Sequence, residues 1–498
     1  MKTKITAFAI FLLMAASICL PACGPETPEG GDGQKNIQAS EESGTAENGG
    51  GANSRESIPD NLPEKDYGGY EFRFYTNPGN ILESAVNDRF APEAEIGEVV
   101  NDAVFRRNRL VEERFGVNIK TIDSGGDYVQ HTSKVKNSVL TGDDAFDVAF
   151  VHVVTGPNLT LENVAYNLLE IPQFDFGKPW WQKQTNEELA LAGKMFLGSN
   201  SIFYAGLSGT HVMYFNRQKI ADYGLDMPYE SVFAGTWTYD ELISMTKDVY
   251  EDLNGNGQKD REDFYGYVGL SLFAGLWTSC DIPVLEKGGD EILTIGVNTE
   301  KTINLIDKIY DWYYNSPGVL AEPDYSTDWQ KDIFADNRGM FVLGEINDAP
   351  SKFVASEVEY GIVPLPKYDT AQENYRSFSG DQFFMVPQTA SVESLERAGT
   401  ILEAMSAEGY KKIIPAYYEI ALKNKYLQDE DSIKVLDLIN DSRTISFAYI
   451  YDNWEGFAHM GNDLFGGKPT NDFASYYEKR LKSAQKRVDA IIRGFTEN

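Results

Sequence analysis

The stretch Tyr70-Glu71-Phe72-Arg73-Phe74 begins the folded part of the chain and sets its class. Aromatic and charged residues alternate with period two, which predicts a strand with one buried face. Apolar residues between Val99 and Phe115 then recur at helical spacing, and Gly116 follows where a helix would end. Two further apolar runs, Val117–Ile122 and Phe146–Val151, predict more strands. The order predicts an α/β sheet whose strand ends line a cleft.

The same alternation continues towards the C-terminus. Strands are predicted at Met195–Leu197, Phe203–Leu207, Val212–Phe215, Phe264–Val268, Gly339–Leu343 and Tyr360–Pro364, and helices at Leu242–Val249, Ile303–Tyr313, Leu395–Met405 and Leu481–Ile491. Thr238 and Glu241 have capping-box spacing before one of these helices. From Gly409 onward helices dominate, so we expect a helical C-terminal part.

The N-terminus has the features of an export signal. Lys2 and Lys4 precede an apolar run, Ile5–Leu20, that is too short for a comfortable membrane span. The run ends in Leu20-Pro21-Ala22-Cys23, which resembles a bacterial lipobox, so we expect residues 1–22 to be removed and Cys23 to be lipidated. The alternative is a conventional signal peptide cut near Ala22, with Cys23 incidental.

Residues 23–65 are rich in Gly, Glu, Ser, Asn and Pro and carry almost no apolar side chain. Such a stretch cannot bury a core, so it predicts a flexible tether. The expected location is the outer face of a bacterial cytoplasmic membrane, where the lipid holds the folded part.

Composition limits the partners. The 498 residues carry a net charge of −32, and the field of such a chain repels nucleic acid and anionic membrane surfaces. We therefore expect a neutral solute. Twenty-eight Tyr, twenty-eight Phe and seven Trp would suit stacking on sugar rings, although core packing explains most of them. Cys280 is alone in the body of the chain, so an internal disulfide would need Cys23.

The stretch 252–263 has the spacing of a calcium loop. Gly257 stands where the loop bends, and a strand rather than a second helix is predicted after it. The expected ligands are Asp252, Asn254, Asn256, Gln258 through its carbonyl, Asp260 and Asp263. We expect a structural Ca²⁺ with a Kd of about 10⁻⁵ to 10⁻³ M. The alternative is an acidic surface turn that binds nothing.

The order of several short motifs resembles one family. These are Phe146-Asp147-Val148, Lys178-Pro179-Trp180-Trp181, Tyr214-Phe215-Asn216, Pro228-Tyr229, Thr236-Trp237-Thr238, Tyr360-Gly361-Ile362-Val363-Pro364-Leu365-Pro366-Lys367 and Pro415-Ala416-Tyr417-Tyr418, together with the lipobox. The chain is similar to the extracellular solute-binding lipoproteins of ABC importers, in the class (family 1) that includes maltose-binding protein.

The resemblance implies a class II periplasmic-binding-protein-like fold of two α/β lobes. It places residues 66–208 and 362–405 in lobe 1 and residues 209–361 and 406–498 in lobe 2. The hinge strands would cross near Gly206–His211 and Tyr360–Leu365. It also implies a monomer that closes on a solute and passes it to an ABC-type permease.

The cleft residues are chosen by residue type and position. Trp277 and Trp454 are expected to stack on the solute, and Trp180, Trp181 and Trp237 to be structural. The remaining candidates are Phe273, Asn77, Thr210 and Asp381. For each tryptophan the alternative is a buried packing role, and for each polar candidate an ordinary loop residue.

Two other classes of function stay open. A surface glycoside hydrolase would need two carboxylates flanking a sugar bond, and acidic residues are too common here to exclude one. An adhesion lipoprotein would use the same tether. Sequence signatures of esterases, zinc proteases and phosphate-binding loops are absent from the sequence, so we expect a binding protein and no enzyme.

Overall fold

The computed structural model describes residues 55–77, 90–269, 273–288, 292–323, 328–380, 383–422 and 430–497. The described residues all belong to a single compact unit. The export signal, Cys23 and most of the predicted tether lie outside the described residues. Within the described part, no helix is long and apolar enough to span a membrane.

The first sheet has the strand order β13 (Phe383–Met385), β3 (Val148–Val151), β1 (Tyr70–Thr76) and β2 (Val117–Asp123). β1 is parallel to β2 and β3, whereas β13 is antiparallel to β3. Helix α3 (Val99–Phe115) begins at Glu98, whose carboxylate accepts from two backbone amides of the first turn, and ends at Gly116 with φ 60°. The strand–helix–strand prediction is confirmed.

The second sheet has the order β11 (Tyr360–Val363), β4 (His211–Asn216), β10 (Gly339–Glu345), β6 (Phe264–Val268) and β5 (Tyr250–Glu251), with β9 (Val319–Leu320) beside β6. β10 is antiparallel to β4 and parallel to β6. Helix α10 (Tyr239–Thr246) begins at Thr238, whose hydroxyl oxygen accepts from the Glu241 amide at 3.4 Å. Trp180 and Trp237 are fully buried and Trp181 is nearly so, as expected of structural residues.

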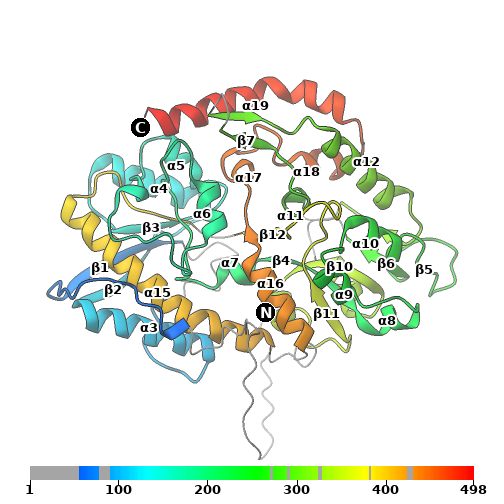
Figure 1. The fold of residues 1–498 in the computed structure, drawn as a ribbon, viewed down its shortest axis with the longest axis horizontal. Helices are drawn as coiled ribbons and strands as arrows, with labels where there is room; N and C mark the ends of the chain where they lie inside the picture. The colour runs from blue at the N-terminus through cyan, green and yellow to red at the C-terminus, as the bar shows by residue number, and fades with distance from the viewer. Residues whose placement is uncertain are drawn as a thin grey trace, which may run out of the picture. The chain divides into compact units, whose positions relative to one another are not determined.

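Two short ribbons complete the strands, β12 (Ser377–Phe378) with β14 (Arg443–Thr444) and β7 (Leu285–Lys287) with β8 (Leu293–Ile295). The other helices are α4 (Tyr128–Thr141), α5 (Pro157–Leu161), α6 (Lys183–Leu189), α7 (Ala205–Ser208), α8 (Arg217–Asp222), α9 (Pro228–Ala234), α11 (Phe273–Ser279), α12 (Glu300–Asn315), α13 (Trp329–Ala335), α14 (Asp348–Ser351), α15 (Val392–Leu422), α16 (Glu430–Asp441), α17 (Phe447–Tyr451), α18 (Met460–Phe465) and α19 (Phe473–Thr496), and the 3₁₀ helix is η1 (Leu168–Glu170). Figure 1 shows their arrangement around the sheets.

The strands predicted at Met195–Leu197 and Phe203–Leu207 are wrong. Near the first, Gly198 forms only an isolated bridge with Phe384, and the second region contains the short helix α7. Apolar runs of this length do not distinguish a strand from a buried turn of helix. Both are buried on all sides, so neither shows a periodic alternation of apolar and polar residues.

Each sheet has its own hydrophobic core, which defines lobe 1 around β1 and lobe 2 around β4. The chain first passes from the lobe 1 core to the lobe 2 core between Ile202 and Tyr204, a few residues before the expected crossing at Gly206–His211. The second crossing lies later than predicted. β11 pairs within the lobe 2 sheet, Trp237 donates to the Pro364 carbonyl at 2.9 Å, and Tyr375 still belongs to the lobe 2 core. Residues 362–375 therefore pack with lobe 2.

The C-terminal stretch 406–498 packs on both cores and not in lobe 2 alone, as the family resemblance implied. Ile445, Phe447, Val488 and Ile491 lie in the lobe 1 core, whereas other residues of α18 and α19 lie in the lobe 2 core. α19 and α15 each contact both lobes along their length (Figure 1).

The predicted tether is shorter than expected. Ile58 and Leu62 pack against the lobe 1 core, Asp60 pairs with Arg114 at 2.5 Å, and Lys178 donates to the Pro59 carbonyl at 2.8 Å. Residues 55–65 thus belong to the folded body, because two apolar side chains and one ion pair suffice to hold so short a stretch.

Candidate functional site

The first crossing, residues 203–210, lies between the carboxyl end of β3 in lobe 1 and the carboxyl end of β10 in lobe 2. At its start the Phe203 ring contacts Phe150 of β3 with centroids 4.6 Å apart. At its end the Asn347 amide, just after β10, donates to the Ser208 carbonyl at 2.9 Å. Because open α/β sheets bind ligands outside the carboxyl ends of their strands, we place the candidate site beside this crossing.

The carboxyl group of Glu345 lies on the lobe 2 side of this site, on a residue whose backbone is held by neighbouring side chains. Glu345 ends β10, its amide donates to the Asp348 carboxylate at 2.7 Å, and its carbonyl accepts from the Tyr214 hydroxyl at 2.7 Å. Asp348 pairs with Lys331 at 2.8 Å. Burial raises the pKa of Glu345 to about 7, although Lys331 opposes this rise. The site therefore holds a half-buried carboxyl group that titrates near neutral pH.

Two tyrosines form an aromatic wall at the crossing. Tyr204 stacks on Tyr417 of α15 with centroids 4.5 Å apart and planes at 22°. Both side chains are largely buried, and burial raises the pKa of the Tyr417 hydroxyl. The motif Pro415–Tyr418 thus brings α15 to the crossing.

The polar candidates have mixed outcomes. Asn77 follows β1 directly and is 1% exposed. Thr210 is fully buried and its hydroxyl donates to the Gly206 carbonyl at 2.7 Å, so its side chain holds the backbone of the crossing. Asp381 lies outside the described residues. Phe273 begins α11, and its side chain lies outside the description.

The two candidate stacking tryptophans differ in exposure. Trp277 is 3% exposed within the lobe 2 core, and its indole N–H has no hydrogen-bond acceptor among the described residues. Trp454 is 49% exposed and lies on the loop between α17 and α18. Of the two, only Trp454 presents ring surface to a solute.

Trp454 is connected to the crossings by a series of ring contacts. It stacks on His459, which contacts Tyr449 at 5.0 Å. Tyr449 contacts Phe378 of β12 at 5.0 Å, and Phe378 contacts His211 of β4 at 4.6 Å. The series of ring contacts thus leads from the exposed Trp454 to residues that adjoin the two crossings, Phe378 and His211. This route could not be read from the sequence, because its members are distant in the chain.

The Trp454 loop is held in an uncommon conformation. Trp454 has φ 65°, rare for a bulky residue, and Asn453 before it has φ 49°. The buried Asp452 carboxylate accepts from the amides of Gly456 and Ala458 and so fixes the loop. Strain of this kind concentrates at functional sites.

Comparisons with known proteins identify the fold. No family model matches the sequence, and no curated protein matches it. Among solved structures, UgpB from Mycobacterium tuberculosis in complex with glycerophosphocholine matches with 15% identity and a TM-score of 0.55, over 85% of this chain and 99% of that one. The chain has the fold of the extracellular solute-binding proteins.

Two more structures agree. The galacto-N-biose/lacto-N-biose I-binding protein of an ABC transporter from Bifidobacterium longum matches with 13% identity and a TM-score of 0.54, over 86% of this chain and 99% of that one. The maltose/maltodextrin-binding domain MalE from Bdellovibrio bacteriovorus, bound to maltotriose, matches with 12% identity and a TM-score of 0.51, over 84% and 100%. The two-lobed, class II prediction is thereby supported at the level of fold.

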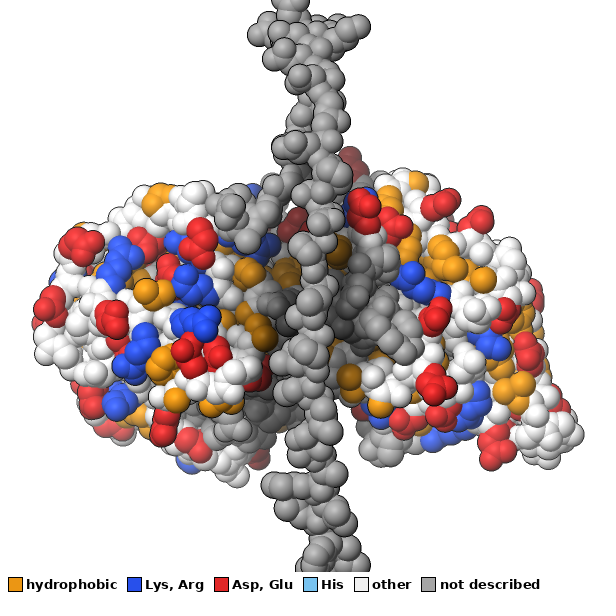
Figure 2. All heavy atoms as spheres, turned by 90° about the horizontal axis from the view of Figure 1, so that it is seen from below, with side chains coloured by type: hydrophobic (Ala, Val, Ile, Leu, Met, Phe, Trp, Pro, Cys, Tyr) orange, Lys and Arg blue, Asp and Glu red, His pale blue; other side chains and the backbone are white. Residues whose placement is uncertain are grey.

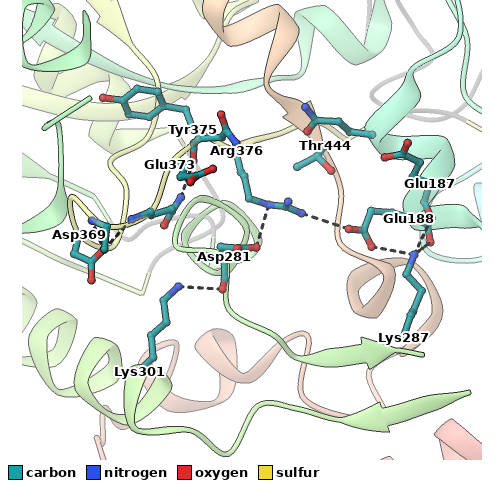
Figure 3. Close-up of a pocket in the computed structure, with 14 residues that line it drawn as sticks. Glu187, Glu188, Asp281, Lys287, Lys301, Asp369, Glu373, Tyr375, Arg376 and Thr444 are labelled. Atoms are coloured by element: carbon teal, nitrogen blue, oxygen red, sulfur yellow. Dashed lines mark hydrogen bonds and ion pairs between the residues drawn. The ribbon is translucent and has the colours of Figure 1, made fainter. Parts of the chain in front are cut away.

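A separate cavity of about 710 Å³ lies where α6 of lobe 1 meets segments of lobe 2 (Figure 3). Its charged lining comprises Glu187, Glu188, Asp281, Lys287, Lys301, Asp369, Glu373 and Arg376. Of the predicted cleft residues whose side chains the structure describes, none lines it. On the face seen in Figure 2, acidic and basic side chains are also interspersed, although the whole chain is strongly acidic.

The loop 252–263 is held by its own side chains. The Asp252 carboxylate accepts from the amides of Gly255 and Gly257 at 2.7 and 2.8 Å, and the buried Asp263 carboxylate accepts from the Tyr250 hydroxyl at 2.9 Å. The amide groups of Asn254 and Asn256 donate to Asp260. Across the described ranges, no group of three or more His, Cys, Asp or Glu side chains is placed to hold a metal. The carboxylates here are engaged with amides, although the loop bends as a calcium loop does.

Proposed function

We propose that this protein is an exported solute-binding protein that captures a small solute between its lobes and delivers it to an ABC-type permease. The observation that carries the proposal is the pair of hydrophobic cores joined by two crossings, the first of which lies at the carboxyl ends of β3 and β10. Such an architecture closes on its ligand by hinge motion and needs no catalytic group. Two of the three similar structures described above are binding proteins by their own descriptions, and the third is a complex with glycerophosphocholine.

The solute that we favour is a sugar or oligosaccharide. Trp454 offers an exposed ring on which the C–H face of a pyranose can stack, and the Glu345 carboxyl group can accept from hydroxyl groups. Two of the similar structures are described as sugar-binding proteins.

A zwitterionic polar solute is the second candidate. The site carries Glu345 beside the Lys331–Asp348 pair, so it offers charges of both signs. One similar structure holds glycerophosphocholine. This candidate departs from the neutral solute that the net charge predicts.

Titration calorimetry tests the proposal against a panel of mono- and oligosaccharides, with glycerophosphocholine as the zwitterionic member and product analysis after long incubation. Binding of a sugar without turnover supports the first candidate, and preferential binding of the zwitterion supports the second. Cleavage of a glycosidic bond would assign the protein to the glycoside hydrolases. Failure to bind any solute would leave the adhesion alternative.

We also propose that the lipid on Cys23 holds the protein at the outer face of the cytoplasmic membrane as a monomer. The lipobox-like stretch before Cys23 supports this. Growth with a labelled fatty acid should label the wild type and not Cys23→Ser. Equal labelling of both would refute the anchor.

A structural Ca²⁺ in the loop 252–263 is the last part of the proposal. The ligand spacing and the bend at Gly257, which has φ 73°, support it. If Ca²⁺ binds, Asp252, Asp260 and Asp263 exchange amide partners for the cation.

A further inference from the structure

One carboxylate joins segments of both lobes at the cavity in Figure 3. Glu188 lies on α6, next to Leu189 of the lobe 1 core. Its two oxygens pair with Lys287 at 3.5 Å and with Arg376 at 3.4 Å. The Phe447 amide donates to it at 3.2 Å. Four chain segments thus meet at a single side chain (Figure 3).

Arg376 belongs to the lobe 2 side of the cavity, because it follows Tyr375 of the lobe 2 core. Lys287 stands between the lobes. It is on β7, which follows Val284 of the lobe 2 core, but it pairs in the ribbon with Leu293 of the lobe 1 core, and its ammonium group also donates to the Glu187 carbonyl at 2.7 Å. Arg376 also pairs with Asp281 at 3.4 Å. The pairs therefore bridge the lobes at the point where the second crossing leaves lobe 2.

We propose that Glu188 is the centre of an ionic latch that holds the lobes at the angle seen in this structure, and that solute-driven hinge motion must work against it. Each lobe has its own core, so the latch can open without unfolding either lobe. The inference does not depend on which solute binds.

The geometry makes the latch weak enough to open. The side chains of Glu188, Lys287 and Arg376 are 24 to 28% exposed, and they line a cavity of about 710 Å³. Ion pairs with such exposure are screened by salt and contribute little individually. Together they bias an equilibrium between two lobe angles that lie close in free energy.

Spin labels on the two lobes measure the angle directly. Leu140 of α4 and Val354 after α14 are 62% and 65% exposed, so both accept a label after substitution by cysteine, with Cys19 and Cys23 replaced by serine. Cys280 is fully buried and stays unlabelled. In Glu188→Gln we expect a broader or shifted inter-lobe distance distribution at low salt. About 1 M NaCl should produce the same change in the wild type and little further change in the variant.

Glu187→Gln is the matched control. Glu187 is adjacent, its side chain is 65% exposed, and its carboxylate pairs with Lys183 at 3.9 Å and acts on Lys287 only through its field. The inter-lobe distance distribution of Glu187→Gln should therefore stay close to that of the wild type. Arg376→Gln removes the positive partner of the same ion pair. It should change the inter-lobe distance distribution as Glu188→Gln does, which would exclude a local folding defect as the cause. If Glu188→Gln and Arg376→Gln both keep the wild-type distribution at low salt, or if Glu187→Gln shifts it equally, the latch is refuted.

Discussion

Trp454 and His459 stack face to face, with ring centroids 3.5 Å apart and planes at 8°. His459 is largely buried, and burial lowers its pKa to about 4, so a neutral imidazole supports the indole at physiological pH. One face of the indole is therefore covered and the residue is still 49% exposed.

This arrangement predicts that Trp454→Ala weakens solute binding about tenfold, because ring stacking contributes about 0.5–1.5 kcal/mol beyond buried area. Trp454→Phe should lose less. The measurement is calorimetry with the best solute of the panel, with thermal unfolding as the control for folding. An unchanged Kd in Trp454→Ala would remove Trp454 from the site.

Trp277 should show the opposite behaviour. Because its side chain is 3% exposed in the lobe 2 core, Trp277→Ala leaves a large cavity and should lower the free energy of unfolding by about 3–5 kcal/mol. Urea denaturation measures this loss. Trp277→Phe should cost less, since it also removes a buried N–H that has no acceptor in the described part of the chain. A stable Trp277→Ala with lost solute binding would restore the stacking role.

The two tryptophans differ in burial, which the sequence could not predict. Helix α3, its end at Gly116 and the cap at Thr238 could be predicted, because each depends on residues a few positions apart. The core on which an apolar face packs depends on distant partners. For that reason the second crossing at Arg376 and the divided packing of α19 were not predicted.

The site residues show the same limit. Glu345 has no sequence signature, and its importance comes from burial at a strand end beside Lys331. Tyr417 lies within a motif that the family resemblance had already singled out, but its partner Tyr204 is more than two hundred residues away. Pairings of this kind need the fold.

Glu403 should make stability depend on pH. This fully buried carboxylate of α15 accepts from the indole N–H groups of Trp180 and Trp181 at 2.9 and 3.0 Å. Burial raises its pKa to about 7, although these hydrogen bonds oppose the rise. The folded state therefore binds the proton more tightly than the unfolded state, whose carboxyl group titrates near 4.5.

From this shift, the contribution of Glu403 to stability is fully present below about pH 4.5 and is lost as the pH rises to about 7, by roughly 2–3 kcal/mol. Urea unfolding at pH 5 and pH 8 measures the change. Glu403→Gln should flatten this pH dependence, whereas Glu393→Gln, an 85% exposed side chain on the same helix, should retain it. An identical profile in Glu403→Gln would show that other groups cause it.

Calcium should stabilise the fold without acting on the solute. At about 1 mM Ca²⁺ and a Kd of about 10⁻⁵ to 10⁻³ M, mass action stabilises the fold by about 0.4–2.7 kcal/mol, so a chelator should lower the melting temperature. Asp252→Asn should abolish this change in melting temperature, because Asp252 is the first expected ligand. Its carboxylate is exposed, so it can exchange the amides of Gly255 and Gly257 for a cation. Glu251→Gln, the neighbouring exposed residue outside the ligand set, should retain it. The proposal of a structural Ca²⁺ in the loop 252–263 is contradicted if the chelator leaves the melting temperature unchanged. It is also contradicted if Ca²⁺ alters solute affinity at constant stability.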